Sequence, residues 1–358
     1  MRVVYLADAP YIHTRRWVRH FVERGWDAHV ISFRPAEIEG ATVHHVAGLE
    51  AIGKARYLVR ARHVSALVAR LRPQLLHALH LTSYGFLAGL SGFQPSIVSV
   101  WGTDVLEAPS LTPFHRWLTR QALARAGAVT ATGLRLAEAT LPHTPLRKPV
   151  TVIPYGVDLD RFSPSPRGER SRLTVGAVSR LSPEKGFEYL LRAVAALRDR
   201  GLVLDVLLAG DGPSRPALES LARDLRLDAR FLGEVPHDDV PAVLQRLDVF
   251  AMPSTWEGFG VSAIEASAME LPVVASDVYG IPDVVIDGET GLLVPPRDVH
   301  AIAAAVERLA HDAELRRVLG RAGRAFVERN YRWRDNAALM ERLYAEMTER
   351  PSQRPVRA

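Results

Sequence analysis

The chain of 358 residues contains no cysteine. Disulfide bonds and thiolate chemistry are therefore excluded, although this absence does not identify a cellular compartment. No apolar run approaches the roughly eighteen residues of a membrane-spanning helix, so we expect none. Residues 1–8 form a short apolar run that ends at Asp8 and lacks the longer apolar region and cleavage site of a signal peptide. This run is typical of a first buried strand and predicts a cytoplasmic protein.

Several functional motifs are also missing. No Gly-x-Gly-x-x-Gly sequence follows the first apolar run, which disfavours a dinucleotide-dependent reductase. The chain has no zinc-ligand spacing and no basic-aromatic RNA-binding motif, so nucleic acid is the least expected partner. No internal repeat of fixed period is present.

The charge is divided unevenly along the chain. The whole chain carries a formal net charge of +5. Residues 1–150 hold 18 Lys+Arg against 9 Asp+Glu (+9), which leaves 27 against 31 (−4) for residues 151–358. A basic half suits an anionic partner such as an acidic membrane surface or a phosphorylated acceptor. Solubility alone is an equal explanation.

The composition, 47% hydrophobic and 24% charged, is that of a globular protein long enough for two domains. Apolar runs alternate with helical patterns, which predicts α/β domains with parallel sheets. We expect strands near residues 2–7, 28–32, 42–46, 74–79, 96–101, 127–132, 150–153, 173–178, 203–209, 229–232, 248–252, 272–275 and 291–294. We expect helices near residues 14–24, 54–72, 83–91, 112–126, 133–140 and through 298–350.

The most informative segment is residues 253–269, which follows the expected strand 248–252. Glu257 and Glu265 lie eight residues apart around a Gly-x-Gly turn, and a helical pattern begins after the turn. A helix N-terminus offers free N–H groups and a positive dipole end, which suit phosphate. Carboxylates beside it can hold hydroxyl groups. Together these features suggest a nucleotide-sugar site.

This segment resembles the E-x7-E motif of the retaining glycosyltransferases of family 4, which have the GT-B fold. Five further segments resemble that family in the same order, and the resemblance is strong over about residues 150–330 and weaker before them. These segments are residues 153–162, 176–186, 209–213, 231–235 and 279–296. One such motif is weak evidence, whereas the ordered set is specific.

The resemblance implies two Rossmann-like domains that face each other across a deep cleft. Residues 1–160 would form the acceptor-side domain and residues 161–330 the nucleotide-sugar domain. Residues 331–350 would form a helix that crosses back to the first domain. The polar, Pro- and Ser-rich segment 161–171 is the expected junction. No metal and no other cofactor is expected, because the family is generally metal-independent.

Arg180 and Lys185 follow the expected strand 173–178 and can hold a diphosphate. Negative charge grows on the departing phosphate, so fixed cations there favour the transition state. By resemblance, Glu257 positions the donor sugar and Glu265 holds the ribose hydroxyls. A solvated turn is the alternative interpretation of Arg180 and Lys185. Without the motif context, an ordinary surface glutamate would be the preferred interpretation of Glu265. The other expected donor-binding residues are Gly258, Phe259, Gly260, Val261 and Ser262 at the turn, with Gly233, Glu234 and Val235 against the nucleobase.

The first domain departs more from the family. A His-Thr-Arg segment replaces the usual glycine-rich loop, and Trp101 stands where many members have a catalytic-site histidine. The acceptor-side candidates are His13, Thr14, Arg15, His80, Trp101 and Asp104. His77 is interpreted as a hydrogen-bonded core residue.

Three other patterns have simpler interpretations. The sequence Gly210-Asp-Gly212 is read first as a turn. Asp158 and Asp160 have the spacing of a metal-binding pair, but we expect a structural role. The basic helical pattern of residues 54–72 could lie on an anionic membrane, although a solvated helix face is the more favoured interpretation.

The sequence therefore predicts a retaining glycosyltransferase that moves a hexose-type sugar from a UDP- or GDP-sugar to an acceptor hydroxyl. Polysaccharide, glycolipid or lipid-linked glycan synthesis is the expected context, in the cytoplasm with possible peripheral contact at the inner membrane face. Two alternatives remain open: a sugar-nucleotide epimerase of the same architecture, and a degenerate domain that only binds carbohydrate or nucleotide.

Overall fold

The computed structural model describes residues 1–46, 56–144, 149–165 and 172–349. The chain divides into two compact units. The first contains Met1–Pro154 and the chain from Asn336 onward, and the second contains Tyr155–Asp335. Residues 155–160, which the sequence analysis assigned to the first domain, therefore belong to the second unit.

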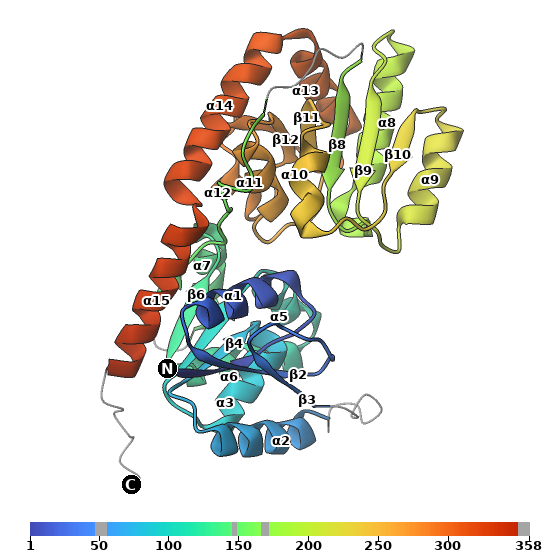
Figure 1. Cartoon of the computed structure of the whole chain (residues 1–358). Coiled ribbons are helices and arrows are strands. Elements are labelled where there is room, and N and C mark those ends of the chain that lie inside the picture. The colour runs from blue at the N-terminus through green and yellow to red at the C-terminus, as the bar shows by residue number, and fades with distance from the viewer. Residues whose placement is uncertain (47–55, 145–148, 166–171, 350–358) are drawn as a thin grey trace. The chain divides into compact units, whose positions relative to one another are not determined.

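The first unit is built on a seven-stranded parallel sheet with the order β3-β2-β1-β4-β5-β6-β7 (Figure 1). Its strands are rich in Val, Leu and Ile, as expected for parallel strands that are buried on both faces. They are β1 (Arg2–Leu6), β2 (Asp27–Ser32), β3 (Thr42–His45), β4 (Leu75–Leu79), β5 (Ser96–Val100), β6 (Ala128–Ala131) and β7 (Val150–Val152).

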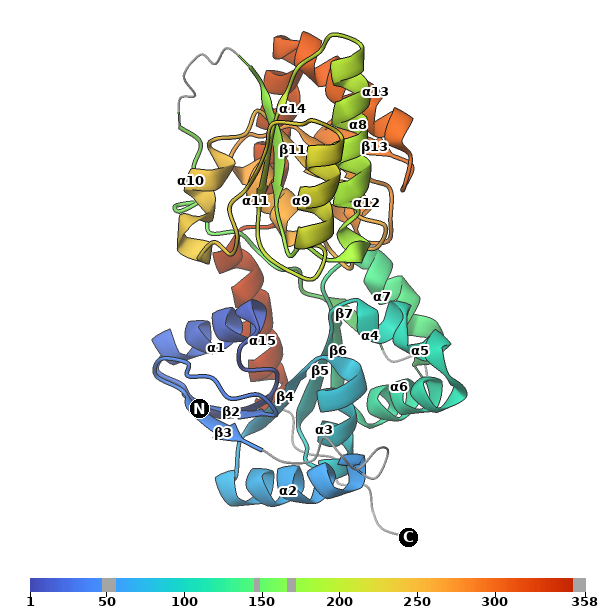
Figure 2. The ribbon, with the colours of Figure 1, turned by 90° about the vertical axis from the view of Figure 1, so that its right-hand side faces the viewer.

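Helices cover both faces of this sheet. Alternate residues of a strand point to opposite faces, so Val4 and Leu6 enter one apolar core while Tyr5 faces the other side. Figure 2 shows α3 and α6 on one side and α1 and α15 on the other. The helices and helical turns of this unit are α1 (Ile12–Glu23), α2 (Arg56–Leu71), η2 (Leu81–Gly85), α3 (Phe86–Ser91), α4 (Thr103–Leu106), α5 (Ala108–Leu111), α6 (Pro113–Arg125), α7 (Leu134–Thr140), η3 (Leu141–His143) and α15 (Trp333–Glu349).

The last described helix, α15, is tied into the first unit by a buried polar network. The ring of Tyr344 stacks on Phe21 of α1 at a centroid distance of 4.6 Å. Its hydroxyl contacts Nδ1 of His77, and Nε2 of the same histidine lies 2.7 Å from the Ser99 hydroxyl. His77 and Tyr344 are fully buried. The network joins α15 to the middle of the sheet and confirms that His77 is a core residue.

The second unit is built on a six-stranded parallel sheet with the order β10-β9-β8-β11-β12-β13. Its strands are β8 (Thr174–Val178), β9 (Asp205–Ala209), β10 (Ala229–Phe231), β11 (Val249–Met252), β12 (Val273–Ser276) and β13 (Gly291–Val294). Both sheets thus have the doubly wound order, which runs outward from a central strand in two directions.

The helices of the second unit also lie on both faces, as right-handed crossovers require. Helix α8 packs with α13, and α11 packs with α14 (Figure 1). The helices and turns are η5 (Pro183–Lys185), α8 (Phe187–Asp199), α9 (Arg215–Asp224), η6 (His237–Asp239), α10 (Val240–Leu244), α11 (Val261–Ala268), α12 (Ile281–Val284), α13 (Val299–His311) and α14 (Ala313–Asn330).

All of these strands lie within about two residues of the ranges predicted from the sequence. The sequence pattern predicted helix throughout residues 298–350, but the structure divides this segment at Asp312 and near Tyr331. The short helices α4 and α5 were not predicted, because four residues hold too little periodic pattern. None of the helices in the described residues is both long and apolar enough to span a bilayer.

Candidate active site

The strand order of the second unit reverses between β8 and β11. The chain leaves these neighbouring parallel strands toward opposite faces of the sheet, which opens a crevice at their carboxyl ends. Two loops meet there: residues 179–186 after β8 and residues 253–260 after β11.

Lys185 and Glu257 form an ion pair across this crevice. Nζ of Lys185 lies 2.6 Å from Oε2 of Glu257. The side chains are only 19% and 15% exposed. An ion pair at this depth is screened less than one at the surface, so each charge holds the other in place. The pair combines a cation that can hold a phosphate with a carboxylate that can hold a hydroxyl group.

Close backbone packing brings the two loops together. The N–H of Thr255 donates to the carbonyl of Glu184 at 2.8 Å. Gly186 has a φ of +63°, and a Cβ atom at this position would lie 2.2 Å from the carbonyl oxygen of Pro253. Only glycine fits, since any side chain would push the loops apart and separate Lys185 from Glu257.

Glu265 lies in the second turn of α11, and its side chain is 7% exposed. Its Oε1 atom lies 2.8 Å from Nε2 of His237, at the start of η6. The His237 ring also contacts the buried ring of Phe162 at a centroid distance of 5.5 Å. A buried carboxylate needs hydrogen-bond partners, and this histidine supplies one.

The N-terminus of α11 completes the segment. Gly260 is the N-cap residue, and no side chain of the described residues caps the helix. The described hydrogen bonds include none from the backbone N–H groups of residues 258–262. These groups and the positive end of the helix dipole suit an anionic ligand.

The remaining residues predicted for the donor lie at the same edge of the sheet. Arg180 is exposed just after β8 and makes no ion pair with a described residue. Gly233 is buried after β10, and its carbonyl accepts from the N–H of Gly210 at 2.7 Å. Glu234 is exposed, and Val235 is half-buried.

The strand order of the first unit reverses between β1 and β4. Near this second crevice three aromatic rings cluster. Tyr11 lies 5.2 Å from His13 and 5.6 Å from Trp101, measured between ring centroids. His13 and Trp101 are 6.2 Å apart in an edge-to-face arrangement. Tyr11 is 44% exposed, so the cluster presents aromatic surface to solvent.

Asp104 fixes the backbone that carries Trp101 of this cluster. Its side chain is almost fully buried, with one oxygen accepting from the Leu81 N–H at 2.9 Å and the other from the Gly102 N–H at 2.9 Å. The Trp101 N–H adds a longer bond at 3.2 Å. The carboxylate thus joins the loops after β4 and β5 and fixes the backbone of Trp101. In the structure Asp104 thus has backbone partners, and the acceptor-side role considered from the sequence stays a prediction.

The other candidates in the first unit differ in burial. His80 is half-buried directly after β4, with a φ of +113° that is rare for a residue other than glycine. Such strain is often found at functional sites. Thr14 is fully buried, so its side chain lies beneath the surface rather than at it. Arg15 reaches back to the carbonyl of Ala9 at 3.4 Å.

Two family models match the chain. Residues 161–326 match the family described as glycosyl transferases group 1, and residues 2–133 match glycosyl transferase 4-like proteins. The GDP-mannose-dependent alpha-(1-6)-phosphatidylinositol monomannoside mannosyltransferase of Mycolicibacterium smegmatis is 34% identical over 294 residues, which cover 76% of this chain and 75% of the relative. The chain belongs to glycosyltransferase family 4.

Other comparisons give a further glycosyltransferase relative and agree on the fold. The 2-deoxystreptamine glucosyltransferase of Streptomyces kanamyceticus is 34% identical over 232 residues, covering 60% of this chain and 59% of the relative. Sucrose-phosphate synthase from Thermosynechococcus elongatus has a TM-score of 0.81 at 23% identity, covering 97% of this chain and 98% of that one. Anabaena HepE in complex with UDP and glucose has a TM-score of 0.83 at 19% identity, covering 96% and 99%. Both structures show the GT-B fold of this glycosyltransferase.

The structure of this glycosyltransferase therefore brings together several of the residues predicted from its sequence. Lys185 contacts Glu257, and Glu265 lies on the helix that follows the same turn. Their catalytic and binding roles stay predictions. His237 and Tyr11 were not predicted, because neither residue lies in a motif that the family resemblance covers.

The aspartate pair with metal-like spacing has other partners in this glycosyltransferase. Oδ1 of Asp158 accepts from the Asp160 N–H at 3.1 Å, and Asp160 pairs with Arg334 at 3.2 Å. Within the described residues, no group of three or more His, Asp or Glu side chains has a geometry that could hold a metal ion.

Proposed function

We propose that this glycosyltransferase moves a hexose-type sugar from a nucleoside-diphosphate sugar to an acceptor hydroxyl, with retention of the anomeric configuration. The observation that carries the proposal is the Lys185–Glu257 pair at the crevice of the second unit, followed at once by α11 with Glu265. The loop after β8 and the segment from β11 to α11 would thus supply groups for phosphate, for sugar and for ribose hydroxyls.

In the proposed reaction the acceptor hydroxyl attacks the anomeric carbon on the side of the leaving group. The bond between that carbon and the phosphate oxygen breaks, and the acceptor proton passes to the departing diphosphate. Lys185 and Arg180 stabilise the negative charge that grows on the diphosphate. Glu257 orients the sugar and favours positive charge on its ring. The two cations take the part that a metal plays elsewhere, so we propose a metal-independent reaction that a chelator leaves unchanged.

The donor is proposed to be a UDP- or GDP-sugar. The mannosyltransferase of M. smegmatis is named as GDP-mannose-dependent, and the solved HepE structure contains UDP. Glu265 would hold the ribose that both nucleotides share. Gly233, Glu234 and Val235 would contact the base.

The acceptor is proposed to bind the first unit, at the aromatic cluster of Tyr11, His13 and Trp101. Aromatic rings offer flat apolar surface that suits the C–H faces of a sugar ring. We propose polysaccharide, glycolipid or lipid-linked glycan synthesis as the context, since the M. smegmatis relative is named for a phosphatidylinositol-linked acceptor. The proposed location is the cytoplasm, with peripheral contact at an anionic membrane surface.

Calorimetric titration with UDP, GDP and ADP tests the proposal. Saturable binding of one nucleotide that is lost in Glu265→Ala would support the donor site. Turnover of the matching sugar nucleotide should then require an acceptor and be abolished by Glu257→Ala and by Lys185→Ala. Folded protein that binds no nucleotide would overturn the proposal, and interconversion of the donor without acceptor would indicate an epimerase.

A further inference from the structure

We propose that His237 is a positioning residue for the donor nucleoside: it fixes the Glu265 carboxylate so that Oε2 faces the ribose hydroxyls. The inference rests on the proposed function of Glu265. It adds a residue from a separate loop, and that residue acts through another side chain rather than by touching the substrate.

The carboxylate of Glu265 is buried and has few partners. Glu265 is 7% exposed, and no lysine or arginine of the described residues lies within ion-pair distance of it. The main-chain N–H groups ahead of it on α11 point toward the N-terminal end of the helix, so they do not neutralise its side chain directly. A carboxylate in this setting is free to rotate unless a partner holds one oxygen. His237 is that partner, at 2.8 Å from Oε1.

The position of His237 is itself fixed by its neighbours. Its ring contacts the ring of Phe162, which is 1% exposed and therefore part of the rigid core. The backbone of His237 begins the turn η6, whose Asp239 N–H bonds the Pro236 carbonyl at 2.9 Å. Two aspartates follow His237 in this turn, and Asp238 is already paired with Arg161 at 2.6 Å.

The two carboxylate oxygens of Glu265 differ in their hydrogen bonding. The hydrogen bond to His237 uses Oε1, whereas the described residues make no hydrogen bond to Oε2. A carboxylate with one oxygen fixed presents the other in a defined direction. This is the arrangement that a ribose needs, because its two adjacent hydroxyls can donate to a stationary acceptor without an added entropy cost.

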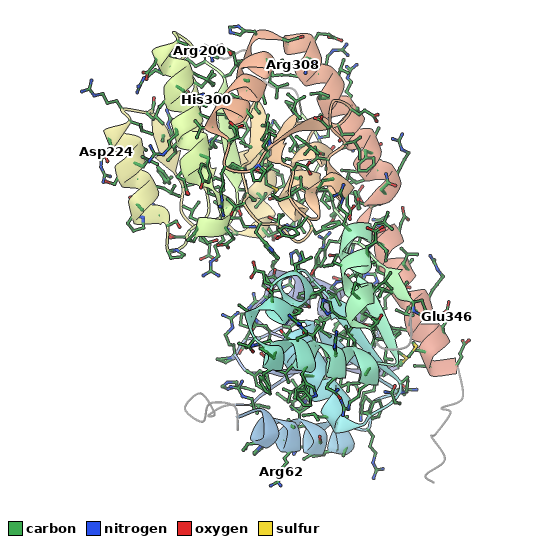
Figure 3. The ribbon with its side chains drawn as sticks, turned by 180° about the vertical axis from the view of Figure 1, so that it is seen from behind. Arg62, Arg200, Asp224, His300, Arg308 and Glu346 are labelled. Atoms are coloured by element: carbon green, nitrogen blue, oxygen red, sulfur yellow. The ribbon has the colours of Figure 1, made fainter. Side chains whose placement is uncertain are left out.

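Two variants separate this role from simple packing. His237→Ala removes the ring, and His237→Phe keeps an aromatic ring against Phe162 but cannot bond to Glu265. His300→Ala is the matched control, because His300 is an exposed histidine of the same unit at the start of α13 (Figure 3). Thermal unfolding of each variant checks that the protein is folded.

The measurement is a binding cycle. Each protein is titrated with the nucleoside diphosphate that the wild type binds, and with the same nucleotide lacking its 2′ and 3′ hydroxyls. In the wild type, removal of the hydroxyls should weaken binding roughly tenfold or more, as for hydrogen bonds to a charged group. In both His237 variants the ratio of the two dissociation constants, without and with the hydroxyls, should fall toward one. In His300→Ala the ratio should stay as in the wild type. The donor KM should rise in the His237 variants with little change in kcat.

An unchanged hydroxyl ratio in the His237 variants would overturn the inference, even if overall affinity falls, because it would show that His237 acts on another part of the nucleotide. In that case the wild type would still bind, so the proposed function would stand. No nucleotide binding by the folded wild type would overturn both.

Discussion

At the residue scale, the central feature is that Lys185 and Glu257 neutralise each other as an ion pair. A diphosphate brings negative charge to Lys185, so Glu257 must release the lysine or share it with the phosphate. Removal of Lys185 alone would leave Glu257 as an uncompensated negative charge beside the phosphate. We therefore expect Lys185→Met to lower nucleotide affinity by roughly tenfold or more, as for the loss of a charged hydrogen bond.

The double variant Lys185→Met/Glu257→Gln distinguishes a charge effect from a loss of structure. Removing both charges should recover part of the nucleotide affinity, although not the turnover, because Glu257 is still needed for the sugar. Calorimetry of the two single variants and the double variant gives the coupling between them. Additive losses of affinity would contradict the electrostatic account.

The aromatic cluster of the first unit gives a second prediction at the residue scale. Trp101→Ala should raise the acceptor KM several-fold and leave the donor KM unchanged, because the cluster lies in the first unit whereas the predicted donor residues lie in the second. Trp101→Phe, which keeps a flat ring, should retain most of the acceptor affinity. Steady-state kinetics with each substrate varied in turn makes the measurement. A change confined to the donor KM would count against an acceptor role.

At the element scale, the loops after β8 and β11 must touch for the site to form. Gly186→Ala places a methyl group 2.2 Å from the Pro253 carbonyl oxygen, so we expect the loops to separate and nucleotide affinity to fall at least tenfold. Gly201→Ala is the control, since it has a similar positive φ of +92° but nothing within 4 Å of the added atom. Backbone strain should lower the stability of both variants by about 1 kcal/mol, and the contact with Pro253 should lower that of Gly186→Ala further. Calorimetry should show lost nucleotide binding only for Gly186→Ala.

The anchoring of α15 predicts an effect of acid on stability. Burial lowers the pKa of His77 from 6.5 to about 3, so this histidine is neutral in the folded protein. In the unfolded chain it takes up a proton below pH 6.5. Its contribution to the free energy of unfolding is therefore complete above pH 6.5 and is lost as the pH falls toward 3. By pH 5 the loss should be on the order of 2 kcal/mol.

His77→Gln tests this effect, because its amide can still bond to Ser99 and Tyr344 but does not titrate. The drop in unfolding free energy between pH 7 and pH 5 should be smaller in this variant than in the wild type, measured by denaturant titration. Burial also lowers the pKa values of His44 and His143, so both proteins keep some acid sensitivity. Equal drops in the two proteins would rule out His77 as the source.

Sequence patterns predicted the elements well for physical reasons that the structure makes visible. The central strands are buried on both faces, so each appears as a continuous apolar run between polar loops, as in residues 273–276. Contacts between loops have no such pattern. The pairing of His237 with Glu265 joins residues 28 positions apart, and the three N–H groups that bond to Asp104 come from two loops. Only the folded backbone brings these groups together.

At the scale of the whole molecule, part of the basic charge of the first half lies on the exposed side of α2. The apolar side of α2, with Val64 and Val68, is buried in the core of the first unit, whereas Arg62 and Arg70 are exposed. Figure 3 shows Arg62 pointing away from α2. The helix therefore cannot insert an apolar face into a membrane, as an interfacial amphipathic helix does. Any contact that it makes with lipid must be electrostatic.

This distinction leads to a prediction about salt. The protein should bind vesicles that contain anionic phosphatidylglycerol at low salt, release them at high salt and ignore neutral vesicles, because exposed charges are screened within about 10 Å at moderate ionic strength. Arg62→Glu/Arg70→Glu should abolish the binding in a co-sedimentation assay. Arg223→Glu/Arg308→Glu makes the same change of charge on exposed positions of the second unit and should retain it. Equal losses in the two double variants would show that net charge alone matters, whereas salt-resistant binding would require an apolar contact that α2 does not offer.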